Sequence, residues 1–180
     1  MIINDCHRYG QPLGPVQGVG YVNELLARLT GTPVKDRTQT NRTLDASPDT
    51  FPLNRTVYAD FSHDNEMIAV YAALGLFRQP VVEPLDPRQP ADTRVWRVNE
   101  LVPFSGRMAV ERLSCRRTGH DATAESAFVA AVRVLVNDRV QPLEFCGATK
   151  DGLCTLDAFV ESQSYARNNG NGDWDKCNID

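Results

Sequence analysis

His63 and Asp64 are neighbours whose types and position could support chemistry. They lie in the run YADFSHDNEMIAVYA, where a strand-like segment leads through a polar turn into a helix. In open α/β sheets, ligands bind beyond the carboxyl ends of strands, and the N-terminus of the following helix offers free N–H groups to an anion. An imidazole can donate a hydrogen bond to a phosphoryl oxygen, and an adjacent carboxylic acid can protonate a leaving oxygen. The pair is therefore a candidate for phosphate binding and general acid catalysis.

A structural role fits the same spacing. Asp64 or Asn65 would then cap the helix, and His63 would pack against the strand. A second pair, His120 and Asp121, lies in RRTGHDATAES, with no strand directly before it and no strong helix after it. We interpret that second pair as part of a surface loop.

No metal site or common catalytic motif is evident. Cys6 and His7 are adjacent but lack further ligands at useful spacing. The sequence has no G-x-S-x-G elbow, P-loop or HExxH motif. The formal charge of −4 argues against nucleic-acid binding, and no apolar run is long enough to span a membrane.

The 180 residues, 42% hydrophobic and 23% charged, have the composition of about one globular domain. A helix over 16–29 is indicated by Pro15 at its start, Gly31 past its end and one apolar face. Gly18 and Gly20 weaken its first turn, which fits either close packing, a ligand or a tolerated helix start. The other expected elements are a strand over 56–61, a buried helix over 66–77, strands over 107–115, 128–136 and 139–143, and a helix over 156–166 capped by Thr155. This order predicts an α/β fold with a small or incomplete sheet.

The cysteines and two sequons indicate an oxidising, secretory context. Cys146 and Cys154 enclose the turn-rich run GATKDGL, which is typical of a small disulfide-closed loop. Asn41 and Asn54 begin N-x-[ST] sequons in a polar connection. We expect a secreted, glycosylated protein, although the sequence begins without a signal peptide. This combination predicts that an N-terminal part is absent.

Long stretches of the chain resemble the C-terminal half of fungal phytases of the histidine acid phosphatase family. They cover about residues 12–177 in family order. The stretches are LGPVQGVGYVNELLARLTGTPV, TLDASPDTFPLNRTVYADFSHDNEM, the LG of AALGLF, VPFSGRMAVERLSC, VRVLVNDRVQPLEFC, GLCTLDAFV, SYAR and GDWDKC.

The resemblance implies a Rossmann-like histidine phosphatase fold with a smaller, mostly helical subdomain. It implies a phosphomonoester hydrolase, 3-phytase-like, that acts on myo-inositol hexakisphosphate through a phosphohistidine and needs no metal or other cofactor. His63 would bind phosphate, Asp64 would donate the proton to the leaving group, and Asn65 would contact substrate. Cys146 and Cys154 match the family's short C-terminal disulfide. Cys115 and Cys177 match cysteines that pair with upstream positions.

One departure from the family pattern is decisive. The family's nucleophilic histidine lies in an R-H-G-x-R-x-P motif, and this sequence contains none. We therefore expect residues 1–180 to be the C-terminal segment of a single domain, inactive without an N-terminal half as its partner. The alternative is an inactive fragment or pseudoenzyme with a structural or partner-binding role.

Overall fold

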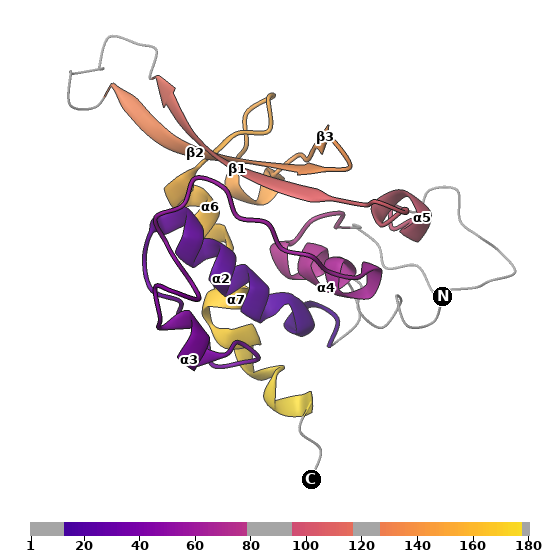
Figure 1. The fold of residues 1–180 in the computed structure, drawn as a ribbon. Helices are drawn as coiled ribbons and strands as arrows, with labels where there is room; N and C mark the ends of the chain where they lie inside the picture. The colour runs from indigo at the N-terminus through magenta and orange to yellow at the C-terminus, as the bar shows by residue number, and fades with distance from the viewer. Residues whose placement is uncertain (1–12, 79–94, 117–126, 178–180) are drawn as a thin grey trace, which may run out of the picture. The chain divides into compact units, whose positions relative to one another are not determined.

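The computed structural model describes residues 13–78, 95–116 and 127–177 (Figure 1). The chain divides into two compact units. The helical unit comprises Met1–Ser105 with Tyr165–Asp180, and the sheet unit comprises Gly106–Ser164. The candidate pair His63 and Asp64 belongs to the helical unit.

Short and medium helices build the helical unit. Its elements are η1 (Pro15–Gly18), α2 (Val19–Thr30), α3 (Arg42–Asp45), α4 (Asp64–Leu74), α5 (Val98–Leu101), η4 (Asn169–Gly172) and η5 (Asp175–Cys177). The short helix α7 (Ser164–Arg167) begins at the last residue of the sheet unit and continues into the helical unit.

The predicted helix over 16–29 is confirmed, with a tighter first turn. The 3₁₀ turn η1 starts at Pro15 and runs directly into α2. Gly31 ends the helix at φ 69°, and its N–H donates to the Ala27 carbonyl at 2.8 Å, as a left-handed C-terminal glycine does. The predicted apolar face is buried; it consists of Val19, Val22, Leu25, Leu26 and Leu29.

Helix α4 confirms the predicted buried helix but is shifted towards the N-terminus, because Asp64 already has helical geometry and Gly75 ends the helix at φ 79°. Ile68, Tyr71 and Leu74 are almost completely buried. The Tyr71 ring packs edge-on against Phe77, with ring centres 5.6 Å apart. An aromatic core of this kind holds the helix by apolar burial.

The prediction of a buried strand over 56–61 is wrong for this structure. No strand forms there, and the Val57 and Phe61 side chains are 79% and 99% exposed. A strand needs a neighbour to accept and donate its ladder hydrogen bonds. Among the described residues, none pairs with this segment.

In the described residues, the sheet unit contains a four-stranded antiparallel sheet, which agrees with the predicted mixed α/β class. Its elements are β1 (Met108–Arg116), β2 (Phe128–Val136), β3 (Arg139–Val140), η3 (Glu144–Cys146), β4 (Cys154–Thr155) and α6 (Leu156–Ser162). Strand β2 is central and pairs with β1, β3 and β4. Asn137 and Asp138 both have positive φ, which fits the tight hairpin turn predicted between β2 and β3.

Three details of this unit differ from the sequence expectation. The third strand ends at Val140 rather than at residue 143, and the two-residue strand β4 was not predicted. The last helix breaks at Gln163, after Ser162 donates its hydroxyl to the Phe159 carbonyl at 2.6 Å. Such a side-chain bond competes with the helical ladder and bends or ends a helix. Thr155 is the predicted N-cap, since its hydroxyl accepts from the Ala158 N–H at 3.2 Å.

None of the helices in the described ranges is both long enough and apolar enough to cross a membrane.

Candidate functional site

His63 and Asp64 lie at the N-terminus of α4, as the sequence predicted. His63 is the N-cap, with extended backbone angles (φ −119°, ψ 164°), and Asp64 is the first helical residue. The His63 carbonyl accepts the first helical hydrogen bond, from the Met67 N–H at 3.0 Å. Both residues therefore lie where the segment before α4 passes into the helix.

Both side chains are exposed to solvent, which argues against one structural alternative. His63 does not pack into the core, because its side chain is exposed and the segment before it forms no strand. Its imidazole also makes no capping hydrogen bond. Among the described residues, His63 has no hydrogen-bond partner for its ring, so the ring is accessible to a ligand.

Asp64 has a limited local role. One carboxylate oxygen accepts a hydrogen bond from the Asn65 N–H at 2.8 Å. This satisfies one of the free donors at the helix start, so capping by Asp64 is part of the structure. The second oxygen of the exposed carboxyl group stays accessible to solvent. Asn65 is half-buried, one position into the helix.

The chemistry available at this end of α4 is proton transfer and anion binding. The 11-residue helix carries a partial positive charge and free N–H groups at its N-terminus. Asp64 and Glu66 are acidic residues of the first turn, and Glu66 accepts a hydrogen bond from the Ser62 hydroxyl at 3.0 Å. A phosphate here would thus need further cationic groups, because the local side chains are mainly acidic.

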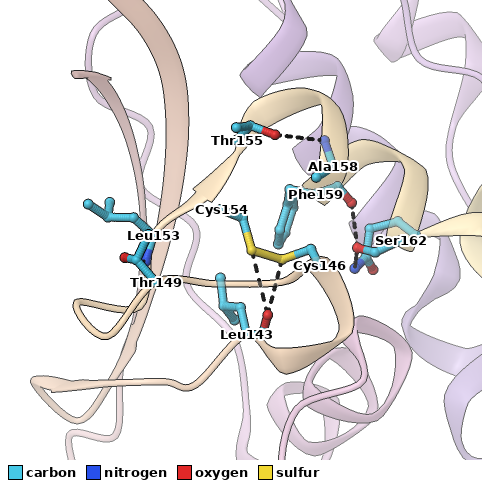
Figure 2. The surroundings of a disulfide bond; sticks show 10 residues. Leu143, Cys146, Thr149, Leu153, Cys154, Thr155, Ala158, Phe159 and Ser162 are labelled. Carbon is cyan, nitrogen blue, oxygen red and sulfur yellow. Dashed lines mark hydrogen bonds between the residues drawn. A yellow bond between two sulfur atoms is a disulfide. The ribbon is translucent and has the colours of Figure 1, made fainter. Parts of the chain in front are cut away.

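The remaining predicted sites fall in three places. Cys146 and Cys154 form the predicted disulfide, with Cα atoms 6.0 Å apart (Figure 2). The sequon residues Asn41 and Asn54 are both exposed. Cys115 is half-buried and unpaired among the described residues.

Cys6, His7, His120 and Asp121 lie outside the described residues, so the surface loop predicted for His120 and Asp121 and the absence of a metal site at Cys6 and His7 stay predictions. Within the described ranges, no group of three or more His, Cys, Asp or Glu side chains could hold a metal ion.

Asn41 already has a structural role. Its side-chain oxygen accepts from the N–H groups of Thr43 and Leu44 at 3.1 and 3.3 Å, which caps α3. The carboxamide nitrogen, to which a glycan would be attached, is not used in these bonds. The cap is therefore compatible with the predicted modification.

The structure adds a group that the sequence analysis did not single out. Arg28 of α2 forms an ion pair with Asp60 at 2.5 Å, three residues before His63. The only sequence signal was an arginine between the apolar residues Ala27 and Leu29, which is too common to indicate a function.

Comparisons with known proteins place these residues in a family context. A sequence profile described as the histidine phosphatase superfamily (branch 2) matches residues 4–137, a range that includes the candidate pair. Phytase A of Aspergillus oryzae is 48% identical over 171 residues, covering 93% of this chain and 34% of the relative.

Two further relatives agree. Phytase A of Arthroderma benhamiae is 45% identical over 176 residues, covering 96% of this chain and 36% of the relative. Phytase A of Neurospora crassa is 46% identical over 189 residues, covering 93% and 37%. The chain thus spans about a third of the length of the curated relatives it matches.

Proposed function

The chain belongs to the histidine phosphatase superfamily (branch 2), and from this premise we propose that it is the C-terminal segment of a phytase-like phosphomonoester hydrolase. The observation that carries the proposal is the identity of 45–48% to three phytases over 93–96% of the chain. In the proposal, residues 1–180 form part of a single catalytic domain. The segment contributes His63, Asp64 and Asn65 to a site that acts on phytate or another phosphomonoester.

Asp64 acts as the general acid in this proposal. A nucleophilic histidine, supplied by the family's R-H-G-x-R-x-P motif, forms a bond to phosphorus while the bond from phosphorus to the ester oxygen breaks. The electron pair of the broken bond goes to the leaving alkoxide, which takes the Asp64 proton. An alkoxide is a poor leaving group, so protonation in the transition state lowers the barrier. Exposure of Asp64 at the start of α4 supports the assignment.

The second half-reaction returns the enzyme to its starting state. Water attacks the phosphohistidine, the nitrogen–phosphorus bond breaks and inorganic phosphate leaves. The Asp64 carboxylate produced in the first step accepts a proton from that water, as microscopic reversibility of acid catalysis suggests. His63 donates a hydrogen bond to a phosphoryl oxygen in both steps, which its unpartnered, exposed ring would permit.

The nucleophile and the phosphate-clamping arginines have no counterpart in this sequence. Cationic donors around a transferring phosphoryl group usually supply the largest catalytic contribution. We therefore propose that the chain hydrolyses phosphate esters only together with an N-terminal partner segment. The absent motif also favours the second candidate, an inactive fragment or pseudoenzyme.

Co-expression tests the two candidates against each other. The chain would be produced with the region of the Aspergillus oryzae phytase A that it does not match, and the purified complex assayed on p-nitrophenyl phosphate and phytate. Hydrolysis that disappears in the His63→Ala complex supports the hydrolase. A soluble, folded complex without activity supports the inactive alternative.

A secreted, glycosylated protein is proposed as the cellular context. The disulfide and the exposed Asn41 and Asn54 support it. Treatment of the natural protein with a peptide N-glycosidase should lower its mass and convert occupied asparagines to aspartates. An unchanged mass would argue against glycosylation at both positions.

A further inference from the structure

The segment that leads to His63 is held in place without a strand ladder. Within the described part of the chain, no backbone-to-backbone hydrogen bond involves residues 52–62. Val57 and Phe61 project into solvent. A segment with so few contacts is normally mobile, so the position of His63 and Asp64 depends on whatever side-chain contacts anchor it.

Arg28 provides the anchor. Its guanidinium lies 4.8 Å from the centre of the Phe51 ring and 5.0 Å from the centre of the Tyr58 ring. The same guanidinium pairs with the Asp60 carboxylate at 2.5 Å. All three partners lie between residues 51 and 60, and they come together around one side chain of α2.

Burial of the Arg28 side chain favours its contacts with the two rings. The Arg28 side chain is only 16% exposed, whereas Asp60 is 40% exposed. Cation–π contacts gain strength when the cation is removed from water. A planar guanidinium can stack on an aromatic ring and still pair with a carboxylate, which an ammonium group does less well.

Tyr21 makes a second, weaker link to the same carboxylate. Its hydroxyl donates to the Asp60 oxygen at 3.4 Å. Burial and the nearby Asp60 charge raise the pKa of Tyr21 to about 12, so the hydroxyl keeps its proton at acid and neutral pH. Asp60 is thus held by two residues of α2, Tyr21 in the first turn and Arg28 about two turns further along the helix.

We propose that Arg28 is a positioning residue: through Phe51, Tyr58 and Asp60 it fixes the segment that ends at His63, and so places Asp64 for proton donation. The inference rests on the function proposed above. Arg28 touches neither substrate nor reacting atoms in this account. A displacement of about 1 Å at a catalytic group can cost up to about 100-fold in rate, so loss of the anchor should be measurable.

Two substrates with different leaving groups distinguish a positioning role of Arg28 from a role in stability alone. In the co-expressed complex, Arg28→Met should lower kcat for glycerol 2-phosphate about 10- to 100-fold, because this alkoxide needs the Asp64 proton. The same variant should lower kcat for p-nitrophenyl phosphate, a better leaving group, less than about threefold. Arg28→Lys keeps the charge and should fall between Arg28→Met and the parent. The exposed Arg42→Met serves as the matched control.

Asp64→Asn is the reference that keeps the two proposals distinguishable. If Asp64→Asn spares the alkyl phosphate, the proton-donor assignment is wrong whatever Arg28 does. If Asp64→Asn selectively slows the alkyl phosphate but Arg28→Met slows both esters equally, Arg28 has only a structural role. The positioning inference then fails while the proposed function stands.

A measurement on the chain itself tests the positioning inference when the co-expressed complex has no activity. Backbone ¹⁵N relaxation of the 180-residue chain should show order parameters above about 0.8 for residues 58–63 in the parent and below about 0.6 in Arg28→Met. Residues 68–74 of α4, beyond its first turn, should keep their values. Unchanged order parameters over 58–63 would overturn the inference independently of any enzymatic activity.

Discussion

Gly18 lies directly against the backbone of Ala69: a Cβ atom at position 18 would be 2.4 Å from the Ala69 carbonyl oxygen. The contact joins η1 to the middle of α4, five residues after Asp64. Two helical segments can approach this closely only where a side chain is missing. Of the three explanations that the sequence left open for Gly18, the structure selects close packing.

Gly18→Ala should therefore destabilise the protein more than an ordinary glycine substitution. The neighbour is backbone and cannot move aside as a side chain tip would, so we expect a loss of about 3 kcal/mol in the free energy of unfolding. Gly31→Ala is the matched control. Among the described residues, nothing lies within 4 Å of a Cβ atom placed there, and only the left-handed φ of 69° opposes a side chain, for a cost of about 1 kcal/mol. Equal losses in urea unfolding of the two variants would contradict the packing argument.

The correct sequence predictions rest on local signals. Pro15 and Gly31 mark the ends of the first helical segment, Asn137 and Asp138 form the turn of the hairpin, and Thr155 caps α6. Each is decided by backbone geometry within a few residues. For the same reason the sequence could place His63 and Asp64 at a helix start.

Other failures are non-local, unlike the break of the last helix at Gln163, which a local hydrogen bond of Ser162 causes. Residues 56–61 have the composition of a strand, but a strand needs a partner, and the described residues supply none. Strand β4 has only two residues and exists because Cys154 meets Val132 across the sheet. The contacts of Arg28 likewise depend on residues 23–32 positions away in the chain, a separation that no periodicity reveals.

Asn23 and Asp36 form a buried polar contact in the helical unit. Its removal should destabilise that unit. The Asn23 amide donates to the Asp36 carboxylate at 2.8 Å and to the Ala166 carbonyl at 3.0 Å. Asp36 also accepts from the N–H groups of Thr38 and Thr40. Asp36→Ala leaves these donors unpaired in a buried site, for a cost of about 2 kcal/mol.

Because the pKa of Asp36 is lowered in the fold, we expect the protein to lose stability in acid. Burial raises the pKa of Asp36, but the hydrogen bonds from Asn23, Thr38 and Thr40 outweigh it and leave the pKa below its ordinary value. A lowered folded-state pKa means that the stabilisation is present above the unfolded value of 3.8 and is lost as the pH falls further. The difference in unfolding free energy between parent and Asp36→Ala should therefore shrink below about pH 4. A free-energy difference between parent and Asp36→Ala that stays constant down to pH 2 would contradict this prediction. The exposed Asp49→Ala is the control.

The disulfide should stabilise the sheet unit by about 2–3 kcal/mol, as expected for a short closed loop. Figure 2 shows Cys146 and Cys154 next to Phe159. Their sulfur atoms lie 3.3 and 3.6 Å from the Leu143 carbonyl oxygen. A Cys146→Ser/Cys154→Ser double variant should unfold at lower urea concentration, and reductant should not lower its midpoint further. Cys115→Ser, which removes the described unpaired cysteine, should keep the parent's sensitivity to reductant.

Glu24 should make the protein less stable as the pH rises through the weakly acidic range. Burial on α2 is the largest cause that raises the pKa of Glu24 to about 7, and the charge of Asp45 adds to it. Asp60 and Asp36 act in the same direction, and the Arg28 charge opposes them. The protonated form is thus favoured in the fold.

Proton linkage sets the direction in which stability changes with pH. Between the unfolded pKa of 4.5 and the folded value of about 7, the native state binds more protons than the unfolded state, so the free energy of unfolding falls with rising pH. Glu24→Gln mimics the protonated carboxyl group at every pH. It should match the parent at pH 4 and exceed it in stability at pH 8, as measured by urea unfolding at both values. The exposed Glu144→Gln should show no such divergence. If Glu24→Gln is no more stable than the parent at pH 8, then Glu24 ionises in the fold as readily as in the unfolded chain, and burial on α2 does not suppress its charge.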